Sequence, residues 1–234
     1  MKLSIVIPVY NEAKYIDRFI PQLVRGLNKQ GFDYELVISE NGSKDKTLSK
    51  AKALSRRFKH VAVISSLQAN YGLAVKTGFL SAKGKYLILF DLDYWDISFI
   101  NRALPMMKIH DAIVGSKWGK GAEDTRPYIR KLSTFIFSSI LKVLFGMKIS
   151  DTHGIKIINR KKFLPLIHKC RMTKDMFDTE LLIRGEYEGL DIDEFGVKIV
   201  EKRTSRSSII KRAIRTLRDL YLLKTYLNKE YDKV

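Results

Sequence analysis

Short apolar runs alternate with segments of helical periodicity through the first part of the chain. The apolar runs, rich in β-branched residues, predict strands at residues 3–9, 34–39, 61–65 and 87–91. Apolar residues at helical spacing predict three helices between them: one that Asn11 caps and Gly31 ends, one at 47–58 and one at 73–81. Because strands and helices alternate, we expect an α/β fold with a parallel sheet and right-handed crossovers.

The alternation becomes less regular after Asp93. Helical periodicity continues at residues 97–109, 130–147, 177–185 and 208–228, and apolar runs predict strands at 111–116, 155–158 and 192–200. The last of these helices is amphipathic and basic, with Leu217 and Leu220 on its apolar side. We therefore predict a globular domain at residues 1–205 and a basic helical tail at residues 206–234.

Composition narrows the class of protein. The chain has 234 residues, of which 45% are hydrophobic, enough to form the core of one large α/β domain. Its formal net charge of +18 predicts an anionic partner: nucleic acid, an anionic membrane surface or a phosphorylated substrate. With Cys170 as the single cysteine, no internal disulfide can form. No signal peptide is visible and no apolar stretch reaches the roughly 18 residues of a membrane span, so we expect a cytoplasmic protein.

Two carboxylates, Asp91 and Asp93, follow the predicted strand at 87–91. The run before them is continuously apolar, which is typical of a strand buried on both faces, and parallel sheets bind ligands at the carboxyl ends of their strands. Carboxylates this close repel each other unless a cation accompanies them, and their oxygens suit Mg²⁺ or Mn²⁺. We predict a divalent metal that carries a diphosphate here. The alternative is a solvated acidic loop.

Eight short segments along the chain carry a further pattern. They lie at residues 5–12, 40–47, 70–78, 82–84, 91–93, 115–117, 151–156 and 177–182. In order and spacing these segments resemble the family-2 glycosyltransferases, over roughly residues 3–207. Within that family they look most like the polyprenyl-phosphate sugar transferases, such as the dolichyl-phosphate mannose or glucose synthases. The resemblance implies the GT-A fold of nucleotide-diphospho-sugar transferases, a Rossmann-like and mostly parallel sheet flanked by helices.

The resemblance also implies a reaction and a set of site residues. The reaction is an inverting transfer of a hexose from a nucleotide diphosphate sugar, of the GDP-mannose or UDP-glucose type, to a polyprenyl or dolichyl phosphate. The implied catalytic residues are Asp93, Asp178, Glu180 and Lys117, and the implied ligands of Mg²⁺ or Mn²⁺ are Asp91 and Asp93. The implied nucleotide-sugar contacts are Pro8, Tyr10, Glu12, Glu40, Asn70, Asp91, Leu92, Lys117 and Arg203. The implied acceptor-phosphate contacts are Arg126, Arg130 and Arg206. An acceptor phosphate is already ionised, whereas a sugar hydroxyl would need Asp178 or Glu180 as a base.

Three positions depart from the family pattern. Glu40-Asn41 stands where the family usually has two aspartates, which leaves the choice of base open. Trp95 cannot ligate a metal, so Asp96 or water would complete the coordination shell. Lys117 replaces the more usual arginine and lacks its bidentate fork.

Other residues leave two interpretations open. His153 is either a metal ligand or, as we favour, a structural or acceptor-side residue. Phe135, Phe137 and Phe145 belong either to the core or to an apolar face at a bilayer. The basic C-terminal helix either adheres to an anionic membrane or packs on its own domain.

We therefore predict a peripheral enzyme on the cytosolic face of a membrane. One alternative is a glycosyltransferase that acts on a carbohydrate, a lipid hydroxyl or a protein. An alternative from another class is a basic nucleic-acid-binding module. That alternative rests on the charge, because the sequence lacks an aromatic nucleic-acid platform and a zinc-finger pattern.

Overall fold

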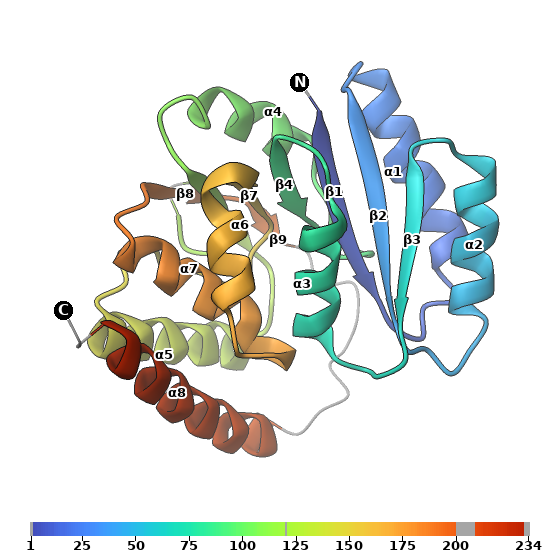
Figure 1. Cartoon of the computed structure of the whole chain (residues 1–234). Coiled ribbons are helices and arrows are strands. Elements are labelled where there is room, and N and C mark those ends of the chain that lie inside the picture. Colours follow the sequence, from blue (N-terminus) through green and yellow to red (C-terminus); the bar gives the residue numbers. More distant parts are fainter. Residues whose placement is uncertain (1, 120, 200–208, 232–234) are drawn as a thin grey trace.

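A seven-stranded sheet forms the centre of the computed structural model, which describes residues 2–119, 121–199 and 209–231 (Figure 1). Its strands, in spatial order, are β3 (Val61–Ser66), β2 (Tyr34–Asn41), β1 (Leu3–Val9), β4 (Tyr86–Leu89), β7 (Lys156–Asn159), β5 (Ala112–Ser116) and β8 (Ile192–Gly196). Strand β7 is antiparallel to β4 and β5, and the other neighbouring pairs are parallel. The prediction of a mostly parallel α/β sheet is therefore confirmed.

Helices cover both faces of this sheet. They are α1 (Ile16–Lys29), α2 (Thr47–Arg57), α3 (Tyr71–Ser81), α4 (Ile97–Met106), α5 (Tyr128–Phe145), α6 (Arg160–Lys169), the 3-10 helix η1 (Lys174–Met176), α7 (Phe177–Tyr187) and α8 (Ile209–Tyr231). Helices α1, α2 and α4 contribute to one buried apolar cluster, and α3, α5, α6, α7 and α8 to the other. A second, short sheet pairs β6 (Glu123–Asp124) with β9 (Lys198–Ile199).

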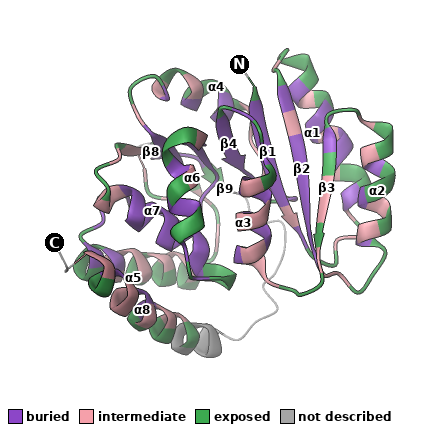
Figure 2. Cartoon of the chain, viewed as in Figure 1, coloured by how far each residue is buried: buried purple, intermediate pink, exposed green. Residues whose placement is uncertain are grey.

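Strand β4 has the double burial that its continuous apolar run predicts (Figure 2). Leu87 and Leu89 belong to one apolar cluster and Ile88 to the other, because successive side chains point to opposite faces of a sheet. The strand ends at Leu89, before the predicted Asp91. Asp91 and Tyr94 exchange backbone hydrogen bonds of 3.1 and 3.3 Å, so the chain turns sharply here and leaves the sheet.

Several expected elements differ from the structure by a few residues at their ends, and two of the differences bear on the fold. Asn11 does not cap the first helix, which begins at Ile16. Its φ is 52°, a left-handed conformation that asparagine tolerates, and its Oδ1 accepts the backbone N–H of Lys44 at 2.9 Å. Residues 192–200, expected as one strand, form β8 and β9 in different sheets, and residue 200 lies outside the described residues. Helix α6 was not expected from the sequence.

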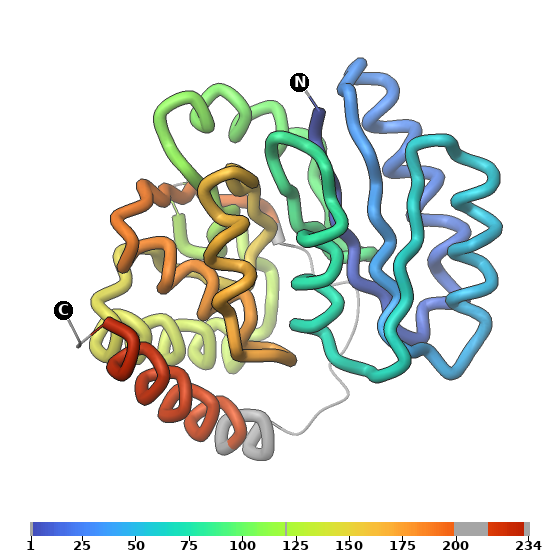
Figure 3. Tube along the Cα trace, in the orientation of Figure 1, coloured from blue at the N-terminus to red at the C-terminus, as the bar shows by residue number. Residues whose placement is uncertain are grey.

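Helix α8 packs on the rest of the fold beside α5 (Figures 1 and 3). Leu220, Leu223 and Leu227 are buried in the apolar cluster that also holds Phe145, and the Lys224 ammonium lies 5.5 Å from the Phe145 ring centroid. The described part of α8 therefore shares the core of the preceding domain. The predicted boundary at residues 205 and 206 falls outside the described residues. Within the described ranges, no helix combines the length and the apolar character needed to cross a membrane.

Candidate functional site

A cavity of about 390 Å³ lies at the carboxyl ends of β1 and β2, beside the start of α3. It is lined by Pro8, Val9, Tyr10, Asn41, Ala69, Asn70, Tyr71, Lys174, Asp175 and Arg215. Three residues predicted to contact a nucleotide, Pro8, Tyr10 and Asn70, thus come together. Glu12 and Leu92 are absent from the lining, and the side chain of Leu92 is buried in the core.

Asn70 joins three segments that are distant in the sequence at this cavity. Its backbone N–H donates to Asn41 Oδ1 at 2.6 Å, and its Oδ1 accepts from Leu73 N at 3.1 Å and Lys174 N at 2.8 Å. Asn70 is therefore the N-cap of α3 and also fixes the segment before α7. Close packing at Gly72 reinforces this junction, since a Cβ there would lie 2.6 Å from the Lys174 carbonyl oxygen.

Glu40 precedes Asn41 of the cavity lining, but its carboxylate forms hydrogen bonds within the turn after β2 and to the neighbouring strand. Its Oε1 accepts the backbone N–H of Ser43 at 2.5 Å, and its Oε2 accepts the Ser65 hydroxyl at 2.6 Å. Desolvation opposes ionisation of this buried side chain, but these hydrogen bonds prevail and lower its pKa. Both oxygens hold the turn after β2.

Asp91 and Asp93 occupy the turn that follows β4, at the same edge of the sheet as the end of β1. Asp91 keeps an exposed surface, while desolvation by the surrounding chain and the negative charge of Asp93 raise its pKa to about 6. Lys156 and Lys117 act in the opposite direction. An acidic pair that repels in this way is suited to a cation, as the sequence predicts.

The predicted third ligand of such a cation is not in place. The Oδ1 atom of Asp96 accepts from Ser98 N and Ser98 Oγ at 2.8 and 2.7 Å, so Asp96 caps α4. Trp95 packs against the apolar core. In the part of the chain that the structure describes, no group of three or more His, Cys, Asp or Glu side chains could hold a metal. The candidate ligand set is therefore Asp91 and Asp93, with the remaining positions open to a ligand or water.

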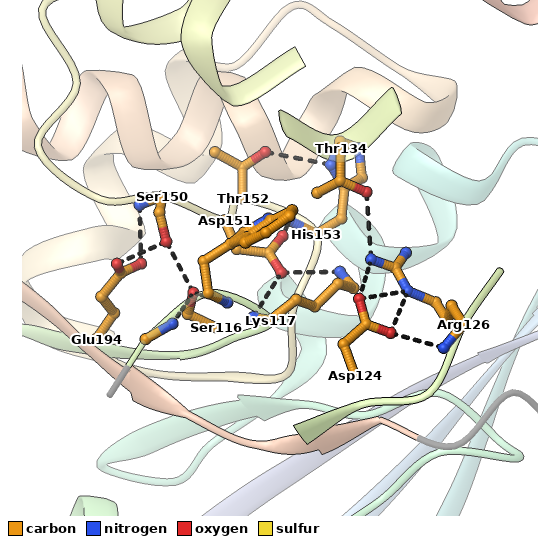
Figure 4. Close-up of polar contacts among 12 residues, drawn as sticks. Ser116, Lys117, Asp124, Arg126, Thr134, Ser150, Asp151, Thr152, His153 and Glu194 are labelled. Carbon is orange, nitrogen blue, oxygen red and sulfur yellow. Dashed lines mark hydrogen bonds and ion pairs between the residues drawn. The ribbon is translucent and has the colours of Figure 1, made fainter. Parts of the chain in front are cut away.

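Lys117 reaches the site with a partner that the sequence does not reveal. Its ammonium lies 2.8 Å from Asp151 Oδ2, and both side chains are largely buried (Figure 4). Burial opposes ionisation of Asp151, but the Lys117 charge prevails and lowers the pKa of this carboxyl. Asp151 therefore contributes stability at pH values above the usual aspartate range, and this contribution is lost as the pH falls through the lowered pKa.

Gly154 lets the loop that carries Asp151 approach the loop that carries Lys117. A Cβ on Gly154 would lie 2.0 Å from the Gly115 carbonyl oxygen. We expect Gly154→Ala to lower the free energy of unfolding by about 3 kcal/mol, because the backbones would have to separate. Urea unfolding measures this loss. Gly26→Ala, which meets only the end of the Ile97 side chain at 3.3 Å, is the control and should change stability by less than about 1 kcal/mol. Equal effects of the two substitutions would contradict the prediction.

The arginines predicted to contact the acceptor phosphate (Arg126, Arg130 and Arg206) and the nucleotide sugar (Arg203) fall into three situations. Arg126 forms a two-pronged ion pair with Asp124 (2.8 to 3.1 Å) and donates to Thr134 Oγ1 at 3.3 Å (Figure 4). Arg130 lies in the first turn of α5. Arg203 and Arg206 lie outside the described residues. Arg126 and Arg130 therefore both stand at the start of α5.

His153 lies beside this group, between α5 and the segment before α7. Its Nε2 is 2.9 Å from the Asp175 carbonyl oxygen, and its ring centroid is 5.4 Å from that of Phe137. These contacts to backbone and to an aromatic ring favour the structural or acceptor-side interpretation over metal binding.

Asp178 and Glu180, the two candidate bases, are both almost completely buried at the start of α7. Asp178 Oδ2 accepts from the Tyr71 hydroxyl at 3.3 Å, and its Oδ1 lies 3.3 Å from the Lys156 ammonium. Glu180 accepts three hydrogen bonds, from Arg171 N, Met172 N and Arg184 Nε, at 2.5 to 2.9 Å. Glu180 thus has the contacts of a structural ion pair, and Asp178 is the one connected to the cavity, through Tyr71.

Several residues of this region were not predicted as site residues, and four of them carry a charge or a titratable hydroxyl that bears on the site. Tyr71, Lys174 and Arg215 line the cavity, and Lys156 is paired in register with Leu89, two residues before Asp91. Tyr71 and Lys156 fall within the segments that carry the family resemblance, so the motif itself could have indicated them. The sequence could not indicate Arg215 as a site residue. It reaches the cavity from α8, outside the segments that carry the resemblance, and its ion pair with Asp175 joins residues far apart in the chain.

This mostly parallel sheet with its covering helices is the GT-A fold of nucleotide-diphospho-sugar transferases. Glucosyl-3-phosphoglycerate synthase from Mycobacterium tuberculosis, solved in complex with Mn²⁺, UDP and glucosyl-3-phosphoglycerate, has the same fold. Its TM-score is 0.67 at 14% identity, and the superposition covers 99% of this chain and 80% of that one.

A sequence profile of the family named Glycosyl transferase family 2 matches residues 4–165, and the chain belongs to this family. The chain is 26% identical to the dolichyl-phosphate beta-glucosyltransferase of Drosophila melanogaster, across 95% of this chain and 74% of that protein. It is 30% identical to the dolichol-phosphate mannosyltransferase of Pyrococcus furiosus over 56% of this chain and 38% of that protein. It is 24% identical to glycosyltransferase AglD of Haloferax volcanii across 90% of this chain but only 35% of that protein.

Proposed function

We propose that this glycosyltransferase moves a hexose, with inversion, from a nucleotide diphosphate sugar to a polyprenyl phosphate. The observation that carries the proposal is the cavity at the ends of β1 and β2, at the edge of the sheet where Asp91 and Asp93 lie. The names of the relatives support the acceptor, since they are dolichyl-phosphate glucosyl- and mannosyltransferases.

The donor half of the site follows from the residues at that edge. Pro8, Tyr10 and Asn70 would hold the nucleoside in the cavity, and Asp91 and Asp93 would hold Mg²⁺ or Mn²⁺. The two acidic side chains fit a hard divalent cation, because they are oxygen donors that repel each other without one. Such a cation would neutralise charge on the departing nucleoside diphosphate. Lys117, held in place by Asp151, would add a fixed positive charge near Asp91.

The state of the candidate bases favours a phosphate acceptor over a hydroxyl acceptor. A hydroxyl must lose its proton to a base within hydrogen-bond reach, whereas a phosphate oxygen attacks without that help. Asp178 and Glu180 are 1% and 0% exposed, so neither presents a free carboxylate to an acceptor. Arg126, just before α5, and Arg130, in its first turn, would attract the acceptor phosphate.

Helix α5 supports a membrane-surface setting. Its exposed apolar residues are Tyr128, Ile129, Leu132, Phe135, Ile136, Val143 and Leu144. Leu217 and Tyr221 of the adjacent α8 are exposed as well. Apolar side chains beside arginines and lysines are the pattern of a surface that lies on anionic lipid. We propose that this α5–α8 face lies on the cytosolic leaflet, so that a polyprenyl phosphate can enter near Arg126 and Arg130.

The membrane proposal predicts a loss of lipid binding without a loss of fold. Phe135 and Val143 are 57% and 84% exposed, and together they offer apolar area to a bilayer. The variant Phe135→Ser/Val143→Ser is expected to bind anionic phospholipid vesicles about tenfold more weakly in cosedimentation. Ile109→Ser is the matched control, because Ile109 is 77% exposed but follows α4, on the opposite side of the molecule (Figure 1). Equal vesicle binding by the double variant and the control would contradict the proposal.

The function itself is tested by transfer of radiolabelled sugar. A panel of nucleotide sugars is offered with Mn²⁺ or Mg²⁺ and either a phosphate-terminated polyprenol or the same polyprenol with a free hydroxyl. We expect label in the phosphate-terminated lipid. Label in the free-hydroxyl lipid alone would overturn the acceptor, and no transfer from any nucleotide sugar would overturn the proposed activity.

A further inference from the structure

Lys156 is a fully buried lysine behind the acidic strand end. It is the first residue of β7 and pairs in register with Leu89, the last residue of β4, two positions before Asp91. Its ammonium lies 3.3 Å from Asp178 Oδ1. A buried charge is costly even when it is paired, because two ions must leave water. Its presence at this position therefore calls for a role beyond stability.

The contacts of this ion pair are incomplete. Neither Lys156 Nζ nor Asp178 Oδ1 has an aligned hydrogen-bond partner among the described residues, although the two atoms face each other. The nearby carboxylate of Glu180, in contrast, accepts three hydrogen bonds. The Lys156–Asp178 pair is thus poorly suited as a stabilising contact, and its charges are left to act on their surroundings.

Those surroundings are the candidate cation site. Lys156 is paired in register with Leu89, two residues before Asp91. Its partner Asp178 accepts a hydrogen bond from the hydroxyl of Tyr71, which lines the cavity. Lys117 is itself paired with Asp151, and Lys156 with Asp178. The Lys156–Asp178 pair therefore lies next to the residues that would hold the cation, and a change in either of its charges would be felt there.

We propose that Lys156 is a positioning residue that sets the charge of the donor site, a role that rests on the proposed function. Together with Asp178 it fixes how strongly Asp91 and Asp93 bind a divalent cation, and from behind the strand end it attracts the nucleoside diphosphate. Because Lys156 is buried, salt in the solvent screens its charge little.

The test measures binding of Mn²⁺ alone by electron paramagnetic resonance in the full chain. Removal of the positive charge in Lys156→Met should tighten Mn²⁺ binding, and removal of the negative charge in Asp178→Asn should weaken it. Each change should be roughly tenfold, from the Coulomb energy of one charge across the site. The double variant Lys156→Met/Asp178→Asn loses one charge of each sign and should bind Mn²⁺ within about threefold of the parent protein. UDP and GDP, titrated without metal, should bind more weakly to Lys156→Met and more tightly to Asp178→Asn, because they are anions.

The proposed role changes the affinities for Mn²⁺ and for the nucleotides in opposite directions, which a structural role would not do. A lysine that only supports the fold would weaken both ligands when it is replaced, and that result would overturn the proposal, as would unchanged binding in all three variants. The two single variants predict opposite shifts, so either one tests the proposal if the other unfolds. The double variant leaves no unpaired buried charge and shows whether the substitutions disturb the site apart from their charge. If the parent protein does not bind Mn²⁺, or binds it equally after Asp93→Asn, the cation site of the proposed function fails. If the parent binds Mn²⁺ at Asp93 but the signs differ from those above, only the role of Lys156 fails.

Discussion

Replacement of Asp93 by asparagine is expected to reduce metal-dependent sugar transfer by at least about 100-fold while the fold is retained. The substitution keeps the size of the side chain but removes one of the two charges at the end of β4. Desolvation is the main cause of the raised pKa of Asp91 and the charge of Asp93 the next, so the substitution should lower that pKa in part. Steady-state kinetics across a Mn²⁺ titration measure the loss, and circular dichroism reports on the fold.

The matched control is Asp17→Asn. Asp17 lies on α1, and its side chain is 53% exposed and forms an ion pair with Lys50 at 2.6 Å. Exposed ion pairs contribute about 1 kcal/mol or less, so this variant should retain both stability and activity. Full activity of Asp93→Asn at saturating Mn²⁺ would show that the acidic strand end does not carry the metal.

The second large effect is expected on stability, from Glu180→Gln. Glu180 is completely buried and accepts hydrogen bonds from two backbone N–H groups and from Arg184. The neutral amide offers one acceptor oxygen in place of two and leaves Glu230, 2.9 Å from Arg184 Nη1, to pair with the Arg184 charge without the fully buried carboxylate. We therefore expect a loss of about 3 to 5 kcal/mol in the free energy of unfolding, measured in urea.

Glu188→Gln provides the comparison, because Glu188 directly follows the same helix and is paired at the surface. Its carboxylate lies 3.1 Å from Lys169 and accepts from the Tyr231 hydroxyl at 3.0 Å. Its replacement should cost about 1 kcal/mol or less. The pair of variants also separates two roles of Glu180. A catalytic base would lose turnover without a change in the unfolding midpoint, whereas the buried ion pair predicts a lower midpoint with turnover retained in the folded fraction.

Local sequence patterns were sufficient to predict most elements of this fold. The strands that become β1 to β4 have continuous apolar runs, and the helices between them keep one apolar face, so periodicity alone identifies both. Helix α6 lacked a distinct signal. It begins with three basic residues and contains Pro165, and the Asn159 side chain that caps it also follows a strand.

The sequence by itself determined the α/β class, the acidic end of the central strand and the family, because each of these depends on residue types in a fixed order along the chain. Only the tertiary structure decided which polar residues are engaged with other protein groups. In the folded chain Lys117 pairs with Asp151, Glu180 accepts three hydrogen bonds, and the buried ammonium of Lys156 lies against Asp178. The physical reason is that a charge removed from water must find its partner wherever packing places one, and sequence spacing does not record which distant segment that will be.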